Sequence, residues 1–133
     1  MNDINRAHFL LAEYLSVSSA QWRKAGVTKL ITMAVGRQVL MSSLMGHKIS
    51  TQSISDIEDM PRDTVKRQLD LLRKIGLVMY DKKTKLYDYN WTNGVVVKYR
   101  EESFTDFKNY SKKITALIED HDVQNHLKQP TVV

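Results

Sequence analysis

The sequence predicts a mainly α-helical fold that contains one small β-hairpin. Between Ile49 and Trp91, a short helix, a tight turn and a longer helix precede two short strands. Helical patterns flank this stretch on both sides, over residues 4–16 and from residue 92 onward. Helix, turn, helix and hairpin in this order are typical of a winged helix-turn-helix with flanking N- and C-terminal helices, in which the hairpin is the wing.

The two central helices are predicted over residues 52–59 and 62–75, with a turn at Met60-Pro61. Pro61 suits a helix start because its φ is preset, and Gly76 suits a left-handed stop at the other end. One face of the longer helix is apolar and comprises Val65, Leu69, Leu72 and Ile75. The opposite arc is charged and comprises Arg62, Asp63, Lys66, Arg67, Asp70, Arg73 and Lys74. Such a helix suits the major groove of duplex DNA, and it is equally typical of an ordinary amphipathic surface helix.

The hairpin is predicted from residues 77–81 and 86–91, which are rich in apolar and aromatic side chains. The tip between these strands carries Lys82, Lys83 and Lys85 without an acidic residue. Basic tips of this kind reach the flanking DNA backbone or the adjacent minor groove, although surface lysines also keep edge strands soluble.

Before the central helices, we expect a helix over residues 4–16, a break at residues 16–19 and a connector at residues 21–26. Thr28 is expected to cap a long, central and buried helix that runs to Met45. We interpret the methionines of this helix as core residues, and a methionine-lined cavity for a small-molecule effector is the alternative.

The segment from Thr92 to about residue 120 is again predicted to be helical, and Ser103 with Asp106 resembles a capping box. We therefore expect two helices that bend near Ser103, followed by a frayed tail after Asp122. A coiled-coil-like seam is formed by Phe104, Phe107, Ser111, Ile114, Ile118 and His121. Because both terminal segments carry more apolar residues than a surface helix needs, we expect them to dimerise. The dimerisation residues that we predict are Ile4, Leu11, Leu15, Phe104, Phe107, Ile114 and Ile118.

The central stretch resembles a known family over about 45 residues. The run Pro61-Arg-Asp-Thr-Val-Lys-Arg, followed by Leu-x-x-Leu-Arg-x-x-Gly-Leu-Val, is similar to the recognition helix and its exit in MarR-like bacterial repressors. The resemblance implies a homodimeric transcriptional regulator that reads a roughly palindromic duplex DNA site. It also implies that residues 92–94 lead into a dimerisation helix. The residues that it places in the major groove are Arg62, Asp63, Thr64, Lys66 and Arg67.

The first central helix departs from that family. Glu58 and Asp59 stand where the family usually has a hydrophobic residue and a glycine, and we expect Asp59 to cap the second helix. With Asp56, these acids also suit a surface that meets a protein. The alternatives to a transcriptional regulator are therefore a winged-helix module for protein–protein interaction, and a replication or mobile-element DNA-binding protein without effector sensing.

The positive charge is concentrated in one part of the chain. The formal net charge is +5, and residues 61–100 hold ten of the 20 Lys and Arg against four of the 15 acids. This segment therefore carries +6, whereas the residues on either side of it nearly balance. A concentrated field of this sign attracts polyanions and makes their affinity fall with salt.

Composition excludes several other classes. The chain has no cysteine, which removes disulfides and thiolate metal sites and fits a cytoplasmic location. No uncharged apolar run is long enough for a membrane span. The four histidines lack metal-ligand spacing, and no phosphate-binding glycine loop or nucleophile motif occurs, so we expect neither a cofactor nor enzymatic activity.

We therefore predict one winged-helix domain over residues 1–133. Its expected parts are an N-terminal helix and connector at residues 1–26, a winged helix-turn-helix core at residues 27–91, a C-terminal helical segment at residues 92–122 and a tail at residues 123–133.

Overall fold

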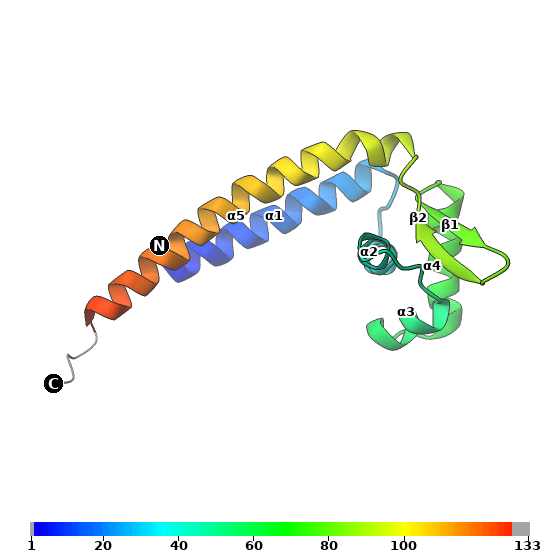
Figure 1. Ribbon diagram of the computed structural model, residues 1–133, viewed down its shortest axis with the longest axis horizontal. Coiled ribbons are helices and arrows are strands. Elements are labelled where there is room, and N and C mark those ends of the chain that lie inside the picture. Colours follow the sequence, from blue (N-terminus) through cyan, green and yellow to red (C-terminus); the bar gives the residue numbers. More distant parts are fainter. Residues whose placement is uncertain (1, 129–133) are drawn as a thin grey trace. The chain divides into compact units, whose positions relative to one another are not determined.

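The computed structural model describes residues 2–128, and the chain divides into two compact units. One unit is Gln21–Tyr99, and the other combines Met1–Ala20 with Arg100–Val133. In chain order the elements are α1 (Asp3–Lys24), α2 (Leu30–Leu44), α3 (Thr51–Glu58), α4 (Arg62–Lys74), β1 (Val78–Asp81), β2 (Leu86–Tyr89) and α5 (Gly94–Lys128) (Figure 1). The described chain is thus mainly helical with one small antiparallel hairpin, as the sequence predicts.

The unit Gln21–Tyr99 contains the buried core. Its members come from α2, α3, α4, the hairpin, the adjoining ends of α1 and α5, and the connecting segments between these elements: Trp22, Val27, Met33, Val35, Val39, Ile49, Ile54, Val65, Leu69, Leu72, Leu77, Val78, Tyr87, Tyr89 and Val96. Gly36 of α2 makes this packing possible beside Trp22. A Cβ atom at Gly36 would lie only 2.9 Å from the indole ring, so the ring can approach α2 only where no side chain is present.

Hydrogen bonds at Gly76 link the end of α4 to the residues just before α5. Gly76 has a φ of 84°, which only glycine adopts without strain, and Leu77 N–H donates to the Leu72 carbonyl over 3.0 Å to close the helix. The side-chain amides of Asn90 and Asn93 donate to the Gly76 carbonyl over 2.8 and 3.1 Å. These bonds fix the point at which the chain leaves the hairpin.

The hairpin pairs β1 with β2 in an antiparallel register that sets Tyr80 opposite Tyr87. A third short segment extends it, because Ile49 and Tyr87 exchange two backbone hydrogen bonds of 2.9 and 2.8 Å. The sequence did not predict this bridge, which ties the chain before α3 to β2.

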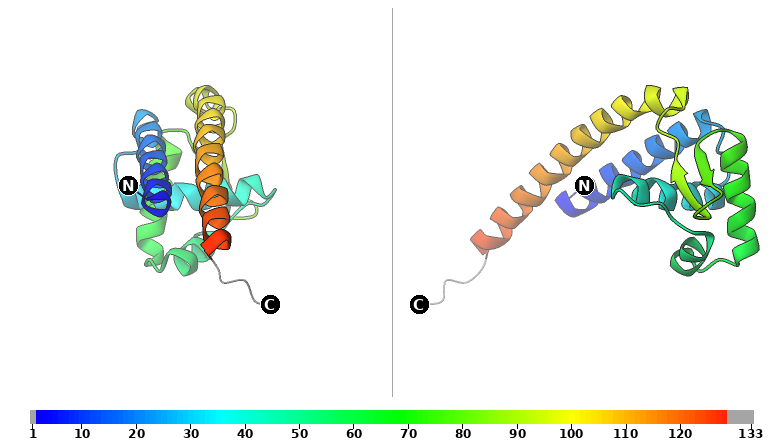
Figure 2. Two further views of the ribbon diagram at one scale, coloured as in Figure 1. Left: turned by 90° about the vertical axis from the view of Figure 1, so that its left-hand side faces the viewer. Right: turned by 45° about the vertical axis from the view of Figure 1, so that its right-hand side comes forward.

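In the other unit, α1 and α5 lie side by side and run in opposite directions (Figures 1 and 2). The ring of Tyr14 on α1 lies 5.9 Å from that of Phe107 and 5.7 Å from that of Tyr110 on α5. The Tyr110 hydroxyl donates to Glu13 over 2.9 Å, and this bond raises the pKa of Tyr110. Aromatic contacts therefore join the two helices near the middle of α1.

The break expected at residues 16–19 is wrong, because α1 is one helix from Asp3 to Lys24. Serine inside a helix costs only about 0.5 kcal/mol relative to alanine, which is too little to interrupt a helix whose last turn is held by the buried Trp22. The expected connector at residues 21–26 is therefore mostly the last turn of α1.

The expected cap and complete burial of α2 are also wrong. The helix begins at Leu30 after Lys29, and Thr28 does not cap it. Met33 is a core residue, and residues 31–40 are all buried or half-buried, but Met41 and Met45 at the C-terminal end are 49% and 74% exposed. These two methionines are therefore not core residues, contrary to expectation.

The two helices expected after residue 92 are a single helix, α5, which shows no break at Ser103. No glycine or proline occurs between Val95 and Lys128, so the backbone has no residue that would stop the helix. The helix also passes Asp122 and ends at Lys128, and the rest of the expected tail, residues 129–133, lies outside the described residues.

Asp59 does not cap α4, contrary to expectation. It ends α3 instead, in a left-handed conformation with a φ of 52°, and Pro61 occupies the position before α4. Aspartate is among the few residues other than glycine that adopt this conformation at modest cost, which explains an acid at a position where glycine would also fit.

Candidate nucleic-acid interface

Helix α4 has one buried face and one exposed basic face, as expected. Val65, Leu69 and Leu72 are completely buried, whereas Ile75, just after the helix, is 38% exposed. Of the five α4 residues predicted to contact DNA, Thr64 is half-buried. The other four are exposed: Arg62, Asp63, Lys66 and Arg67. The core therefore fixes the rotation of the helix and turns its cations toward solvent.

The hairpin tip also presents its cations to solvent. Lys82, Lys83 and Lys85 are all exposed. The turn is closed by a 2.7 Å hydrogen bond from Lys85 N–H to the Asp81 carbonyl, and Lys85 adopts a left-handed φ of 58°. Each lysine therefore projects from an ordered turn at the end of two paired strands.

Asp81 organises this turn. One of its carboxylate oxygens accepts the backbone N–H of Lys83 over 2.9 Å, and the other lies 3.2 Å from Nζ of Lys48. The Lys83 N–H first and the Lys48 ammonium second hold the pKa of Asp81 below its ordinary value. The acid at the base of the tip thus shapes the basic turn and attaches it to the segment before α3.

All eight predicted DNA-contact residues belong to the unit Gln21–Tyr99. Sequence reasoning missed Lys48, because its connection to the hairpin depends on a contact between residues that are 33 positions apart. The only local signal was the basic pair His47-Lys48 just before a predicted helix.

The second candidate surface lies on the helix pair of the other unit. Among residues 2–20 and 100–126, whose side chains the structure describes, none is buried. Of the seven predicted dimerisation residues, Ile114 is half-buried. The other six are about half to two-thirds exposed: Ile4, Leu11, Leu15, Phe104, Phe107 and Ile118. The pair therefore exposes these apolar side chains to solvent, among polar and charged ones.

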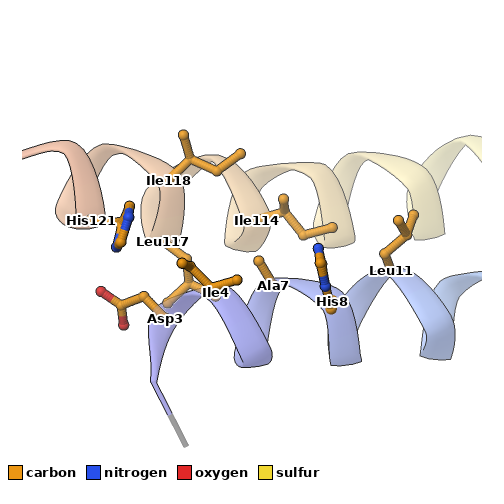
Figure 3. Close-up of a pocket in the computed structure, with 9 residues that line it drawn as sticks. All are labelled: Asp3, Ile4, Ala7, His8, Leu11, Ile114, Leu117, Ile118 and His121. Atoms are coloured by element: carbon orange, nitrogen blue, oxygen red, sulfur yellow. The ribbon is translucent and has the colours of Figure 1, made fainter.

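A groove of about 340 Å³ runs between α1 and α5 (Figure 3). Ile4 and Leu11 of α1 line it together with Ile114 and Ile118 of α5. The polar side chains in its lining are Asp3, His8 and His121. Four of the predicted dimerisation residues thus meet at one apolar groove.

The seam predicted on α5 lies largely toward α1, because Phe107 packs against Tyr14 and Ile114, Ile118 and His121 line the groove, whereas Phe104 is 66% exposed. Tyr110 and Leu117, which the sequence placed beside the seam, are half-buried on the side toward α1 as well. Adjacent faces of this helix both carry apolar residues at alternating steps of three and four, so spacing alone does not choose between them.

No family model matches this chain, and neither the curated proteins nor the solved structures contain a significant match to it. None of the helices in residues 2–128 is long and apolar enough to cross a membrane.

Proposed function

We propose that this chain is a winged helix-turn-helix protein that binds duplex DNA as a transcriptional regulator. The observation that supports this most is the orientation of α4. Its residues Val65, Leu69 and Leu72 are completely buried, while Arg62, Lys66 and Arg67 are exposed. A helix held in this way can enter the major groove with its first turns at base edges and its longer side chains at phosphates.

The hairpin supports the same proposal. Its exposed tip lysines lie in the segment 61–100, whose own net charge is +6. In the proposed complex Lys82, Lys83 and Lys85 contact the backbone or minor groove beside the site that α4 occupies. Asp63 and Thr64 supply the hydrogen-bonding groups at the start of α4 that select among bases.

We also propose that the protein acts as a homodimer through α1 and α5. Over residues 3–20 of α1 and 100–126 of α5 no side chain is buried, and apolar residues such as Phe104 and Ile118 stay in contact with water. A second identical pair would cover them as a four-helix bundle. A two-fold symmetric dimer presents two α4 helices, which suits a palindromic site with half-sites about one helical turn apart.

The acids in and just after α3 make contacts within the chain, which weakens the argument that they form a protein-binding surface. Glu58 accepts a hydrogen bond from Gln38 of α2 over 2.7 Å, and Asp56 accepts one from Gln52 over 2.8 Å. Asp59 ends the helix. Each acid therefore has a role within the chain, and a protein-interaction module is the second candidate.

Fluorescence anisotropy with random-sequence duplex DNA over a salt series tests the proposal. The variant Arg67→Ala/Lys83→Ala removes one cation from α4 and one from the hairpin tip. We expect wild-type affinity to fall steeply with salt, and the variant to lower the slope of log affinity against log salt by about two per subunit.

The matched control is Arg6→Ala/Lys108→Ala, which removes two exposed cations from the helix pair instead. Its salt slope should equal that of the wild type. A wild-type affinity that does not respond to salt, or an equal loss of slope in both variants, would contradict the proposed interface and would favour the protein-interaction module.

A further inference from the structure

Arg73 lies on the charged arc of α4 but is directed toward the hairpin. Its guanidinium carbon is 5.0 Å from the centroid of the Tyr80 ring on β1, within the range of a cation–π contact. Nη1 of the same side chain lies 3.9 Å from a carboxylate oxygen of Asp70, one turn earlier in α4. An aromatic ring and a carboxylate thus hold this cation at the edge of α4 that meets the hairpin.

Tyr80 carries the contact onward to the core. Its ring centroid is 4.8 Å from that of Tyr87, its partner in the antiparallel register. Tyr87 is 4% exposed, and its backbone exchanges two hydrogen bonds with Ile49. A continuous set of contacts therefore runs from Arg73 through Tyr80 to a buried strand residue.

The hairpin needs such a contact because its strands are short. Each strand has four residues, and a two-stranded hairpin of this size is marginally stable by itself in water. Closer to the tip than Tyr80, Lys48 contacts Asp81, and these two side chains are 44% and 32% exposed. The contact between Arg73 and Tyr80 thus joins α4 directly to the strand that leads to the tip.

We propose that Arg73 is a positioning residue for DNA binding. By stacking on Tyr80 it fixes the hairpin relative to α4, so that the tip lysines reach phosphates while α4 occupies the groove. This inference rests on the proposed function and deepens it. It distinguishes Arg73 from Arg62, Lys66 and Arg67, whose cations are proposed to contact the DNA itself.

The first test compares the slope of log affinity against log salt for the wild type and for Tyr80→Leu, a substitution that changes no charge. If the stack positions the tip, Tyr80→Leu lowers the slope by about one to two per subunit, because fewer tip lysines reach phosphates. Tyr80→Phe keeps the ring and serves as the matched control with an unchanged slope. Circular dichroism verifies that each variant is folded, so that a lower slope reports lost phosphate contacts and not lost protein.

The double variant Arg73→Gln/Tyr80→Leu separates positioning from direct contact. If Arg73 acts only through Tyr80, the double variant has the same slope as Tyr80→Leu. If Arg73 touches a phosphate, the double variant loses about one further unit, and the inference is overturned. Should Tyr80→Leu not fold, Arg73→Gln alone decides. Positioning predicts that this variant lowers the salt slope by clearly more than the roughly one unit expected from removing a single charge.

A measurement without DNA keeps this inference separate from the proposed function. The chain has no cysteine, so Lys66→Cys and Lys83→Cys place one spin label on α4 and one at the hairpin tip. Dilution with unlabelled protein ensures that each measured pair lies within one chain. We expect the distance distribution to broaden in Tyr80→Leu and Arg73→Gln, and to stay narrow in Tyr80→Phe.

The outcomes are distinguishable. An unchanged distribution in both Tyr80→Leu and Arg73→Gln would overturn the positioning role whatever the protein binds. A broadened distribution in a protein whose wild type shows no salt-sensitive affinity for duplex DNA would support the contact as the determinant of hairpin position, and would refute the proposed DNA function instead.

Discussion

The hydroxyl of Thr32 in α2 donates a 2.6 Å hydrogen bond to the side-chain oxygen of Gln68 in α4. Both residues are buried, at 5% and 6% exposure, and they lie among apolar side chains of the core. Because a buried polar group is costly unless it is hydrogen-bonded, each residue depends on the other. The pair therefore fixes the rotation of α4 more specifically than apolar packing alone would.

Thr32→Val should destabilise the fold, because it leaves the Gln68 oxygen buried without its donor. We expect a loss of about 1–3 kcal/mol in the free energy of unfolding, measured by urea denaturation. Thr32→Val/Gln68→Met replaces both polar partners with apolar groups of similar shape and should recover part of that loss. A double variant less stable than Thr32→Val would show that the hydrogen bond is not the source of the effect.

Gly36→Ala should destabilise the fold through a steric clash. The added methyl group would lie 2.9 Å from the Trp22 ring, which is itself buried, so the ring or α2 must shift at a cost of about 1–3 kcal/mol. Gly94→Ala is the matched control, because a Cβ atom at the start of α5 meets nothing within 4 Å. Thermal unfolding should show a lower midpoint for Gly36→Ala only, and equal midpoints in the two variants would contradict the close Trp22 contact.

Ile118→Lys should disrupt the proposed dimer. Ile118 lines the groove and is 51% exposed in the single chain, so a lysine there costs little in the monomer but would place a charge inside the four-helix bundle. Light scattering should give twice the 15.4 kDa chain mass for the wild type and a single chain mass for the variant. Leu44→Lys, at a 65% exposed position of α2, should remain dimeric. Loss of the dimer in both variants would mean that association does not depend on the groove.

The free energy of unfolding should fall at alkaline pH because Tyr89 is buried. Burial raises its pKa from 10.0 to about 12, so the folded state favours the neutral phenol. The stability that this preference contributes is complete below pH 10.0 and is lost as pH rises from 10.0 toward 12. The loss amounts to about 2–3 kcal/mol by pH 12. Urea denaturation of the wild type and Tyr89→Phe over this range isolates the effect, and parallel pH profiles would show that Tyr89 ionises without cost in the folded protein.

The boundaries of α4 and the hairpin followed from local sequence. The helix predicted over residues 62–75 is Arg62–Lys74, and the predicted strands contain Val78–Asp81 and Leu86–Tyr89. Pro61 and Gly76 restrict the backbone by their own chemistry, and the apolar face of α4 repeats at helical spacing. Signals of this kind act within a few residues and do not depend on the rest of the chain.

Signals in α1 and α5 were weaker, and there the local reading was wrong. Serines at residues 16–19 and the pair Ser103–Asp106 resemble interruptions, yet both helices continue through them. Each of these residues disfavours a helix by a fraction of a kcal/mol, whereas glycine or proline would cost more. A small preference of this size is overridden by the hydrogen bonding of a long helix.

Apolar spacing on α2 and α5 showed that each helix has hydrophobic faces, but it did not show which neighbour covers each face. The C-terminal end of α2 is exposed. On α5, both Leu117 and Ile118 line the groove beside α1, although the predicted seam contained only Ile118. The bonds Thr32–Gln68, Lys48–Asp81 and Ile49–Tyr87 join residues that are 36, 33 and 38 positions apart. Only the tertiary structure decides such contacts, because they depend on how whole elements pack and not on the preferences of adjacent residues.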